Sequence, residues 1–352
     1  MEINELLKAT IARNASDLHL TVNIPPMVRI NGHLEPLLQE NLNRDMVEKL
    51  AMQIMKEKQK SLFEARGEID FSYSVMGFGR FRVNVFRQRG TVALSIRIIP
   101  PKILTPEELG LPEVMLSLAR KPNGLVLVTG PTGSGKSTTL AALIDLLNNE
   151  ISGHIITLED PIEFLHSHKK CIVNQREITL DSESFVTGLR AALRQDPDII
   201  LVGEMRDLET IATAITAAET GHLVFATLHT CNAAQTIDRI IDVFPPYQQN
   251  QIRVQLSLIL QGICAQTLIP RADKPGRVIA TEILIATPAV RNLIREGKTP
   301  QINTVIQSGS KHGMQSMDSS LKELYLKGII NYEEASKRAT DMESFKQLVH
   351  GF

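Results

Sequence analysis

The segment from Leu125 to Thr138 constrains the fold of this chain more than any other part of it. An apolar run, Leu125-Val-Leu-Val-Thr, leads into Gly130-Pro-Thr-Gly-Ser-Gly-Lys-Ser, and a helix-forming run follows. A strand, a glycine-rich loop and a helix in this order form a phosphate-binding loop. Backbone N–H groups of such a loop point at one phosphate group, and the positive end of the helix adds to the attraction. The chain is therefore expected to bind a nucleoside triphosphate.

The predicted nucleotide-binding residues are those of the loop itself: Gly130, Pro131, Thr132, Gly133, Ser134, Gly135, Lys136, Ser137 and Thr138. In this pattern Lys136 reaches the β- and γ-phosphates, and the hydroxyl of Ser137 holds Mg²⁺. The alternative, a chance glycine-rich turn, is disfavoured because every fixed position of the pattern is present in its strand–loop–helix context. A nucleoside triphosphate and Mg²⁺ are thus the expected cofactors.

The composition limits the class of protein. The chain of 352 residues is long enough for two domains, and its 38 basic and 39 acidic side chains nearly balance. No general charge therefore attracts it to nucleic acid or to anionic lipid. The sequence starts without the features of a signal peptide, and no apolar run reaches the ~18 residues of a membrane-spanning helix. We expect a cytoplasmic protein with no direct membrane insertion. The cysteines lie far apart, in no zinc or disulfide spacing, and are expected to be buried free thiols: Cys171, Cys231 and Cys264.

Residues 1–98 are predicted to form a small α+β domain. An Asn31-Gly32 turn between apolar flanks predicts a hairpin, and a helical pattern covers 44–65. Strands are expected near 69–75, 79–87 and 91–99, joined by turns at Gly77–Gly79 and Arg89-Gly90. Arg82 and Arg97 fall on the polar faces of the last two strands.

A change of pattern follows. Residues 99–112, which begin with Pro100-Pro101, read as a linker. Residues 113–286 are predicted to be an α/β core with a parallel sheet, because helical segments alternate with apolar strands at 125–129, 154–158, 198–202 and 223–227. Residues 287–352 read as a helical, more polar tail.

Carboxylates follow the second strand of this core. Glu159, Asp160 and Glu163 lie at its C-terminal end, the edge where open α/β sheets place their sites. Hydrolysis requires one carboxylate to orient and deprotonate a water. The pattern leaves open which of the three does so, and a solvated acidic loop is the alternative. Pro161 breaks the strand and could direct Glu163 toward the nucleotide.

The third and fourth strands add two more candidates. Asp198 to Val202 is an apolar strand of the Walker B type, but Gly203 replaces the usual terminal aspartate and Glu204 comes next. Glu204 is therefore predicted to hold Mg²⁺ or to position water. His229 lies just past the fourth strand and is predicted to hydrogen-bond the γ-phosphate, with an ordinary polar rim residue as the alternative. His222 begins that strand and is expected to be structural.

Together these blocks resemble the secretion-superfamily ATPases, and within them the PilT family of type IV pilus retraction ATPases. The resemblance covers essentially the whole chain. It rests on the phosphate loop, an acidic box, an atypical Walker B strand, a histidine box, a retraction signature with Val290 where isoleucine is usual, and an N-terminal segment: 130–137, 156–164, 198–207, 221–239, 289–296 and 15–20.

The resemblance implies a PAS-like N-terminal domain and a RecA-like ATPase domain in a homohexameric ring. It also implies that the nucleotide is ATP. ATP hydrolysis would depolymerise the pilin fibre through an inner-membrane platform protein, at the cytoplasmic face of that membrane. Glu163 matches the catalytic glutamate of the family and His229 its γ-phosphate histidine. The family's arginine pair falls on Arg82 and Arg97, and Arg277 corresponds loosely to an interface arginine.

Three alternatives stand beside this reading. Pilus-assembly and type II secretion relatives usually carry a long N-terminal extension and a four-cysteine zinc module, which this sequence lacks. A RecA-like nucleic-acid translocase is disfavoured by the balanced charge and by an aromatic content of 4%. A nonhydrolysing accessory subunit is disfavoured by Glu163, Glu204 and His229. The segment 289–296 is predicted to be an amphipathic helix that couples hydrolysis to movement, with simple packing on the core as its alternative.

Overall fold

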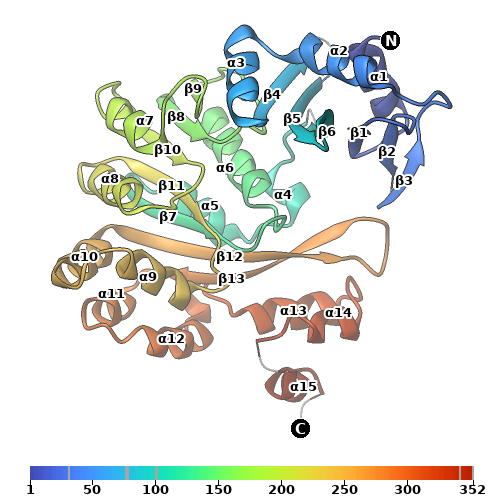
Figure 1. The fold of residues 1–352 in the computed structure, drawn as a ribbon. Coiled ribbons are helices and arrows are strands. Elements are labelled where there is room, and N and C mark those ends of the chain that lie inside the picture. Colours follow the sequence, from blue (N-terminus) through green and yellow to red (C-terminus); the bar gives the residue numbers. More distant parts are fainter. Residues whose placement is uncertain (31, 76–78, 100–101, 341, 351–352) are drawn as a thin grey trace. The chain divides into compact units, whose positions relative to one another are not determined.

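The computed structural model describes residues 1–30, 32–75, 79–99, 102–340 and 342–350. The chain divides into two compact units, coloured along the sequence in Figure 1. The first unit is Met1–Lys102 with Pro161–Leu165, and the second is Ile103–Asp160 with His166–Phe352. The predicted turns at Asn31–Gly32 and Gly77–Gly79, and the Pro100-Pro101 start of the predicted linker, include residues outside this description.

The first unit contains a six-stranded antiparallel sheet in the order β3-β2-β1-β6-β5-β4. Side chains alternate along β5, where Phe81, Val83 and Val85 are buried, because successive residues of a strand point to opposite faces. The helices α1 and α2 pack their leucines onto this apolar side. The elements are α1 (Ile3–Ala12), β1 (Asp17–Leu20), β2 (Met27–Ile30), β3 (His33–Pro36), α2 (Arg44–Ile54), α3 (Glu57–Arg66), β4 (Glu68–Val75), β5 (Gly79–Gln88) and β6 (Thr91–Ile99).

The helical pattern over 44–65 corresponds to two separate helices, α2 and α3. Met55 and Lys56 have extended backbones between them. The buried side chain of Gln59 accepts a hydrogen bond from the backbone N–H of Lys56 at 2.8 Å and so caps the start of α3. A side chain that caps a helix start satisfies a backbone donor that a continuous helix would satisfy internally.

The second unit is built on a seven-stranded sheet in the order β13-β12-β7-β11-β10-β8-β9. Strands β12, β7, β11, β10, β8 and β9 run parallel, and β13 pairs with β12 in the antiparallel sense. The predicted parallel α/β core is therefore present. The strands are β7 (Gly124–Thr129), β8 (His154–Glu159), β9 (Ile172–Glu177), β10 (Ile199–Val202), β11 (Leu223–Leu228), β12 (Leu260–Pro270) and β13 (Arg277–Ile285).

Helices cover this sheet and continue into the predicted helical tail. Figure 1 shows α13 and α14 beside β12 and β13, with α15 beyond α13. Apolar residues of these helices join Ile269 and Ala280 in a separate small core. The helices are α4 (Pro106–Leu109), α5 (Glu113–Ala119), α6 (Lys136–Glu150), α7 (Phe185–Ala192), α8 (Leu208–Glu219), α9 (Ala233–Asp242), α10 (Pro246–Ile259), α11 (Pro288–Arg295), α12 (Ile302–Ser308), α13 (Met317–Leu326), α14 (Tyr332–Ser336) and α15 (Met342–His350), with 3-10 turns at Thr299–Gln301 and Ser310–His312.

Parallel strands bring their carboxyl ends to one edge of the sheet, and this edge collects the predicted motifs. Strand β7 ends at the phosphate loop, β8 ends at Glu159, β10 ends before Glu204, and β11 ends before His229. Across the described residues, no helix is both long enough and apolar enough to cross a lipid bilayer.

Candidate active site

The phosphate loop connects a fully buried strand to a helix. Every residue of β7 is buried, and α6 begins at Lys136. Gly130 has φ +143°, and a Cβ there would lie 2.3 Å from the backbone oxygen of Gln266, so only glycine fits. The loop crest, Pro131 to Gly133, is exposed. The Nζ of Lys136 donates to the backbone oxygens of Gly130 at 2.7 Å and Pro131 at 3.1 Å, so its charge lies against the loop itself.

Glu204 and His229 form a close pair at the same edge. The Nε2 of His229 lies 2.9 Å from Oε1 of Glu204, and Arg206 contacts the same carboxylate oxygen. Burial acts to raise the pKa of the Glu204 carboxyl, but Arg206 and His229 outweigh it and hold this pKa below its ordinary value. The Glu204 carboxylate is therefore ionised at neutral pH and available as a hydrogen-bond acceptor or an oxygen ligand.

The atypical end of the Walker B strand lies in a tightly packed place. A Cβ on Gly203 would lie 3.0 Å from the backbone oxygen of Leu158 and 3.3 Å from Cα of Glu159. A side chain at this position would be tightly packed against the neighbouring strand, and the first carboxylate stands one residue later, at Glu204. Asp198 accepts a hydrogen bond from the backbone N–H of His154 at 2.7 Å, at the opposite end of the strand, as its position in the sequence predicts.

Glu159 is held at the end of β8 by two neighbours. Its Oε1 accepts hydrogen bonds from the hydroxyl of Thr157 at 2.6 Å and from Nε2 of Gln175 at 3.1 Å. The Oε1 of Gln175 in turn accepts from the backbone N–H of His166 at 2.8 Å. These contacts anchor the second-unit residues on both sides of segment 161–165 in the sequence.

The first unit holds the other predicted catalytic residues. Arg82 and Arg97 are directly opposite each other on β5 and β6. Glu163 lies in the segment that groups with this unit, and its Oε1 is 3.9 Å from Nη1 of Arg82. Arg82 is also 3.9 Å from Asp70, and Arg97 is paired with Asp17 at 2.9 Å. The structure therefore brings Glu163, Arg82 and Arg97 together within the first unit.

Asp17 is the more buried member of its pair with Arg97. Its side chain is 10% exposed, against 68% for the arginine. Burial alone would raise the pKa of Asp17, but hydrogen bonds from Ser16 and Arg97 and the charge of Arg97 lower it. The guanidinium of Arg97 is thus held by the ionised Asp17 carboxylate, while most of the arginine side chain is exposed to solvent.

The cysteine prediction was wrong for one residue. Cys171 and Cys264 are buried, as expected, but Cys231 is exposed because it lies in the short loop between β11 and α9. His222 is structural, as predicted: its Nδ1 lies 2.9 Å from the backbone oxygen of Ala217, at the end of α8. Arg277 is exposed at the start of β13.

The predicted tail helix exists as α11, capped by Thr287, with Val290 and Ile294 fully buried. Its two arginines differ in environment. Arg291 is half-buried and donates through Nη1 to the backbone oxygens of Ser257 and of Leu258, the latter at 2.6 Å, at the end of α10. Arg295 is exposed. Part of this helix therefore has the packing role that was the alternative to coupling.

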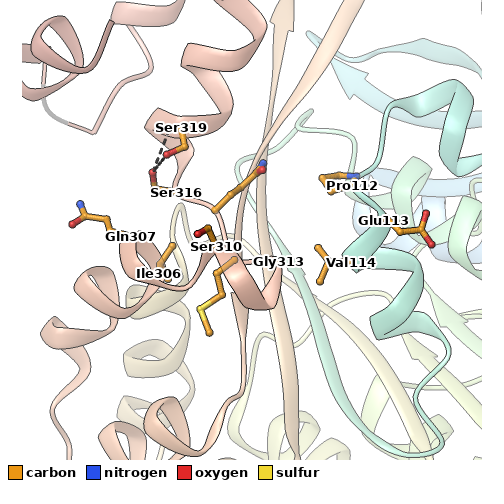
Figure 2. A pocket seen from close by; sticks show the side chains of 11 residues that line it. Pro112, Glu113, Val114, Ile306, Gln307, Ser310, Gly313, Ser316 and Ser319 are labelled. Carbon is orange, nitrogen blue, oxygen red and sulfur yellow. Dashed lines mark hydrogen bonds between the residues drawn. The ribbon is translucent and has the colours of Figure 1, made fainter. Parts of the chain in front are cut away.

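A cavity of about 420 Å³ in the second unit is separate from these motifs. The start of α5 and the segment between α12 and α13 line it, with Glu113, Gln307 and three serines among its polar side chains (Figure 2). None of its lining residues belongs to a predicted site.

Sequence reasoning missed several contacts of the candidate site. Gln266 on β12 donates from Nε2 to the backbone oxygen of Ser134 in the phosphate loop at 2.8 Å. One signal was present, since Gln266 is an amide in the mostly apolar run from Ile263 to Ile269. Asp17 and Asp70 contact the arginine pair. These contacts could not be predicted, because the sequence near each aspartate does not show which distant strand it will contact.

Comparison with known proteins identifies the family. Residues 1–337 match the family described as type II/IV secretion system protein. The chain is 54% identical to the type IV pilus retraction ATPase PilT of Pseudomonas aeruginosa, over 98% of this chain and 100% of that one. It is 49% identical to a twitching motility protein of Neisseria gonorrhoeae, over 91% of this chain and 85% of that one.

Solved structures agree with the sequence relatives. A crystal structure of the pilus retraction motor PilT with bound ADP matches with a TM-score of 0.92 and 50% identity, over 99% of both chains. The Legionella pneumophila ATPase DotB matches with a TM-score of 0.79 and 28% identity, over 99% of this chain and 95% of that one. The mixed α/β fold class predicted from the sequence is thereby confirmed, and so is the use of a nucleotide by an ATPase of this family. The chain belongs to the type II/IV secretion system protein family, and within it to the PilT-type pilus retraction ATPases.

Proposed function

We propose that this chain is a homohexameric motor that hydrolyses ATP to retract type IV pili. The observation that carries the proposal is the edge of the second sheet, where the phosphate loop and the Glu204–His229 pair stand together. Relatives named for pilus retraction and twitching motility, similar over nearly their whole length, support the biological setting.

In the proposed mechanism the loop N–H groups and Lys136 bind the β- and γ-phosphates. Lys136 leaves the loop carbonyls that it contacts now, because phosphate oxygens offer it a stronger, charged acceptor. His229, hydrogen-bonded to Glu204 on one side, contacts the γ-phosphate on the other. The loop thus binds the nucleotide, and His229 responds to whether its γ-phosphate is present.

Glu163 is proposed as the general base that takes a proton from the attacking water. Its Oε1 lies 3.9 Å from Nη1 of Arg82, so the carboxylate and the arginine belong to the same cluster. Arg82 and Arg97 are proposed to stabilise the charge that develops on the transferred phosphoryl group. These three residues act as a set because they belong to one cluster of the first unit.

Ser137 and Glu204 supply a hydroxyl and an ionised carboxylate, the hard oxygen donors that Mg²⁺ prefers. They are the proposed ligands of this ion, which when bound offsets the negative charge of the phosphates. We also propose that Arg277, exposed at the start of β13, faces a neighbouring subunit.

The proposed partners are an inner-membrane platform protein and, through it, the pilin fibre. The motor would work at the cytoplasmic face of the membrane and shorten the fibre by removing pilin subunits. The proposed division of the chain is an N-terminal domain over 1–98, a linker over 99–112, an ATPase core over 113–286 and a helical C-terminal region over 287–352.

The proposal is tested with Lys136→Ala and Glu163→Gln, in solution and in cells. Lys136→Ala is expected to abolish nucleotide binding or turnover, because the cation facing the phosphates is lost. Glu163→Gln is expected to bind ATP and lose about 10²–10⁴-fold in turnover, because an amide cannot accept the proton.

In cells that carry either variant as the only copy, surface pili are expected to form and fail to retract. Cells that lose pilus assembly instead would show an assembly motor. Unchanged ATP turnover by Lys136→Ala would refute the nucleotide site, and stimulation of turnover by single-stranded DNA would favour a nucleic-acid translocase.

A further inference from the structure

Gln266 is a buried amide directly behind the phosphate loop. Strand β12 runs parallel to β7, with Ala265 opposite Thr129, so Gln266 follows at the point where β7 passes into the loop. The residue is 1% exposed. Its Nε2 donates to the backbone oxygen of Ser134 at 2.8 Å, a hydrogen bond between residues that are 132 positions apart.

The same residue touches the loop at both ends. The backbone oxygen of Gln266 lies 2.3 Å from the position that a Cβ on Gly130 would occupy. Its Nε2 lies 3.4 Å from the corresponding position on Gly135. One residue of β12 therefore supports both the first and the last glycine of the loop, through its main chain and its side chain respectively.

The loop dictates which way the amide of Gln266 points. A carbonyl oxygen accepts hydrogen bonds only, so Nε2 and not Oε1 must face Ser134. The Oε1 atom is buried and has no hydrogen-bond partner among the described residues. An unsatisfied buried oxygen costs free energy that an apolar side chain would avoid. The hydrogen bond from Nε2 to the loop offsets this cost.

We propose that Gln266 is a positioning residue for the phosphate loop. In a planar trans peptide the C=O and the following N–H point in opposite directions. Holding the oxygen of Ser134 against β12 therefore turns the N–H of Gly135 away from β12, the direction in which a phosphate would be met. The inference rests on nucleotide binding by this loop, which the proposed function also uses.

The test measures ADP affinity and ATP turnover of the full chain with Gln266→Glu and Gln266→Met. Glutamate keeps the shape of the side chain, but its ionised form has no donor and repels the Ser134 oxygen. At about pH 8 the Glu variant is expected to bind ADP at least about tenfold more weakly, the size of one lost hydrogen bond. KM for ATP is expected to rise similarly, while kcat stays within about threefold.

Titration provides the decisive readout. A buried carboxyl protonates readily, and its O–H then donates to Ser134, so the affinity of Gln266→Glu should recover toward the wild-type value at about pH 6. Gln266→Met, which fills the space without a donor, should bind weakly at both pH values. The Met variant also serves if the Glu variant does not fold.

The chain offers a matched control on the same strand. Gln261 donates from Nε2 to the backbone oxygen of Asn123 at 3.1 Å, before β7 begins. Gln261→Glu should bind ADP like the wild type at both pH values. Wild-type affinity in both Gln266 variants, or equal losses in the Gln261 variant, overturns the inference. Failure of the wild type to bind ADP would instead refute the proposed nucleotide site.

Discussion

At the scale of single residues, close backbone contacts at two glycines shape the edge of the second sheet. The backbone of β8 crowds position 203, and the carboxylate that follows this strand is Glu204, where His229 and Arg206 contact it. Gly130 is required more strictly, because its φ is +143° and a Cβ there would lie 2.3 Å from the backbone oxygen of Gln266 on β12. The Walker B departure thus moves the carboxylate by one residue, at a position where strand packing favours glycine.

Gly203→Asp tests this argument by restoring the usual aspartate. The new Cβ would meet the backbone oxygen of Leu158 and the Cα of Glu159. We therefore expect Gly203→Asp to lower the free energy of unfolding by about 1–3 kcal/mol and to reduce ATPase activity. Glu204→Gln is the comparison: it should lose turnover and keep its melting temperature. A fully stable, active Gly203→Asp protein would contradict the steric explanation.

His166 gives the protein a dependence of stability on pH. Burial lowers the pKa of this ring from 6.5 to about 4, although Asp145, 4.0 Å away, acts in the opposite direction. The unfolded chain takes up a proton below pH 6.5, and the folded ring does so only near 4, so stability falls as the pH drops between these values. The full difference corresponds to about 3 kcal/mol.

The measurement is urea unfolding at about pH 7 and about pH 4.5. The wild type should lose about 2–3 kcal/mol more than His166→Gln over this interval, because the glutamine does not titrate. His33→Gln, at an exposed position on β3, should behave like the wild type. Equal acid sensitivity of the wild type and His166→Gln would mean that the ring is already protonated in the folded protein.

At the scale of elements, the sequence predicted the strands that have a continuous apolar pattern. It missed the strands β12 and β13, whose pairing depends on residues far apart in the chain. The four apolar strands and the glycine-rich loop were placed within a residue or two, because burial on both faces makes a continuous apolar run. Strands β12 and β13 lack that signature. Gln266 and Glu282 interrupt them, and the buried Glu282 is tolerated because it accepts a hydrogen bond from the backbone N–H of Ala233 at 2.8 Å.

Two roles were open for helix α11 from its sequence, packing on the core and coupling of hydrolysis to movement. In the structure its two arginines differ in a way that allows the two roles to be tested separately. Arg291 binds the final carbonyls of α10, so Arg291→Glu would place an anion against oxygens and should lower stability by about 1–3 kcal/mol. Arg295 is exposed, so Arg295→Glu should leave the melting temperature and ATP turnover nearly unchanged. Calorimetry and turnover assays compare the two.

If α11 also couples hydrolysis to movement, Arg295→Glu should stop pilus retraction in cells while its ATPase activity persists. Full retraction by this variant rejects the coupling role. A stable Arg291→Glu protein would contradict the structural role assigned to that side chain.

At the scale of the whole molecule, the predicted catalytic residues fall into two sets, one in each unit. The second unit contains the phosphate loop, Glu204 and His229, and the first contains Arg82, Arg97 and Glu163. The sequence predicted the members of both sets, but not that Glu163 groups with the arginines. Arg82 and Glu163 are 81 positions apart, so no local periodicity reports their contact.

This division predicts a separation of binding from turnover. Arg82→Ala and Arg97→Ala should each leave ADP affinity nearly intact, because the second unit carries the phosphate loop, and should reduce turnover by about 10³-fold or more, as expected for arginines that act on the transition state. Arg29→Ala is the matched control, since Arg29 lies opposite Asp17 on β2, as Arg97 does on β6. Turnover by Arg29→Ala should match the wild type if Arg97 acts through its place on β6, and not merely by adding positive charge beside Asp17.

Calorimetric ADP titration and a phosphate-release assay on the same preparations measure ADP affinity and turnover. A parallel loss of affinity and melting temperature in either variant would show that the arginine supports the sheet and takes no part in the chemistry.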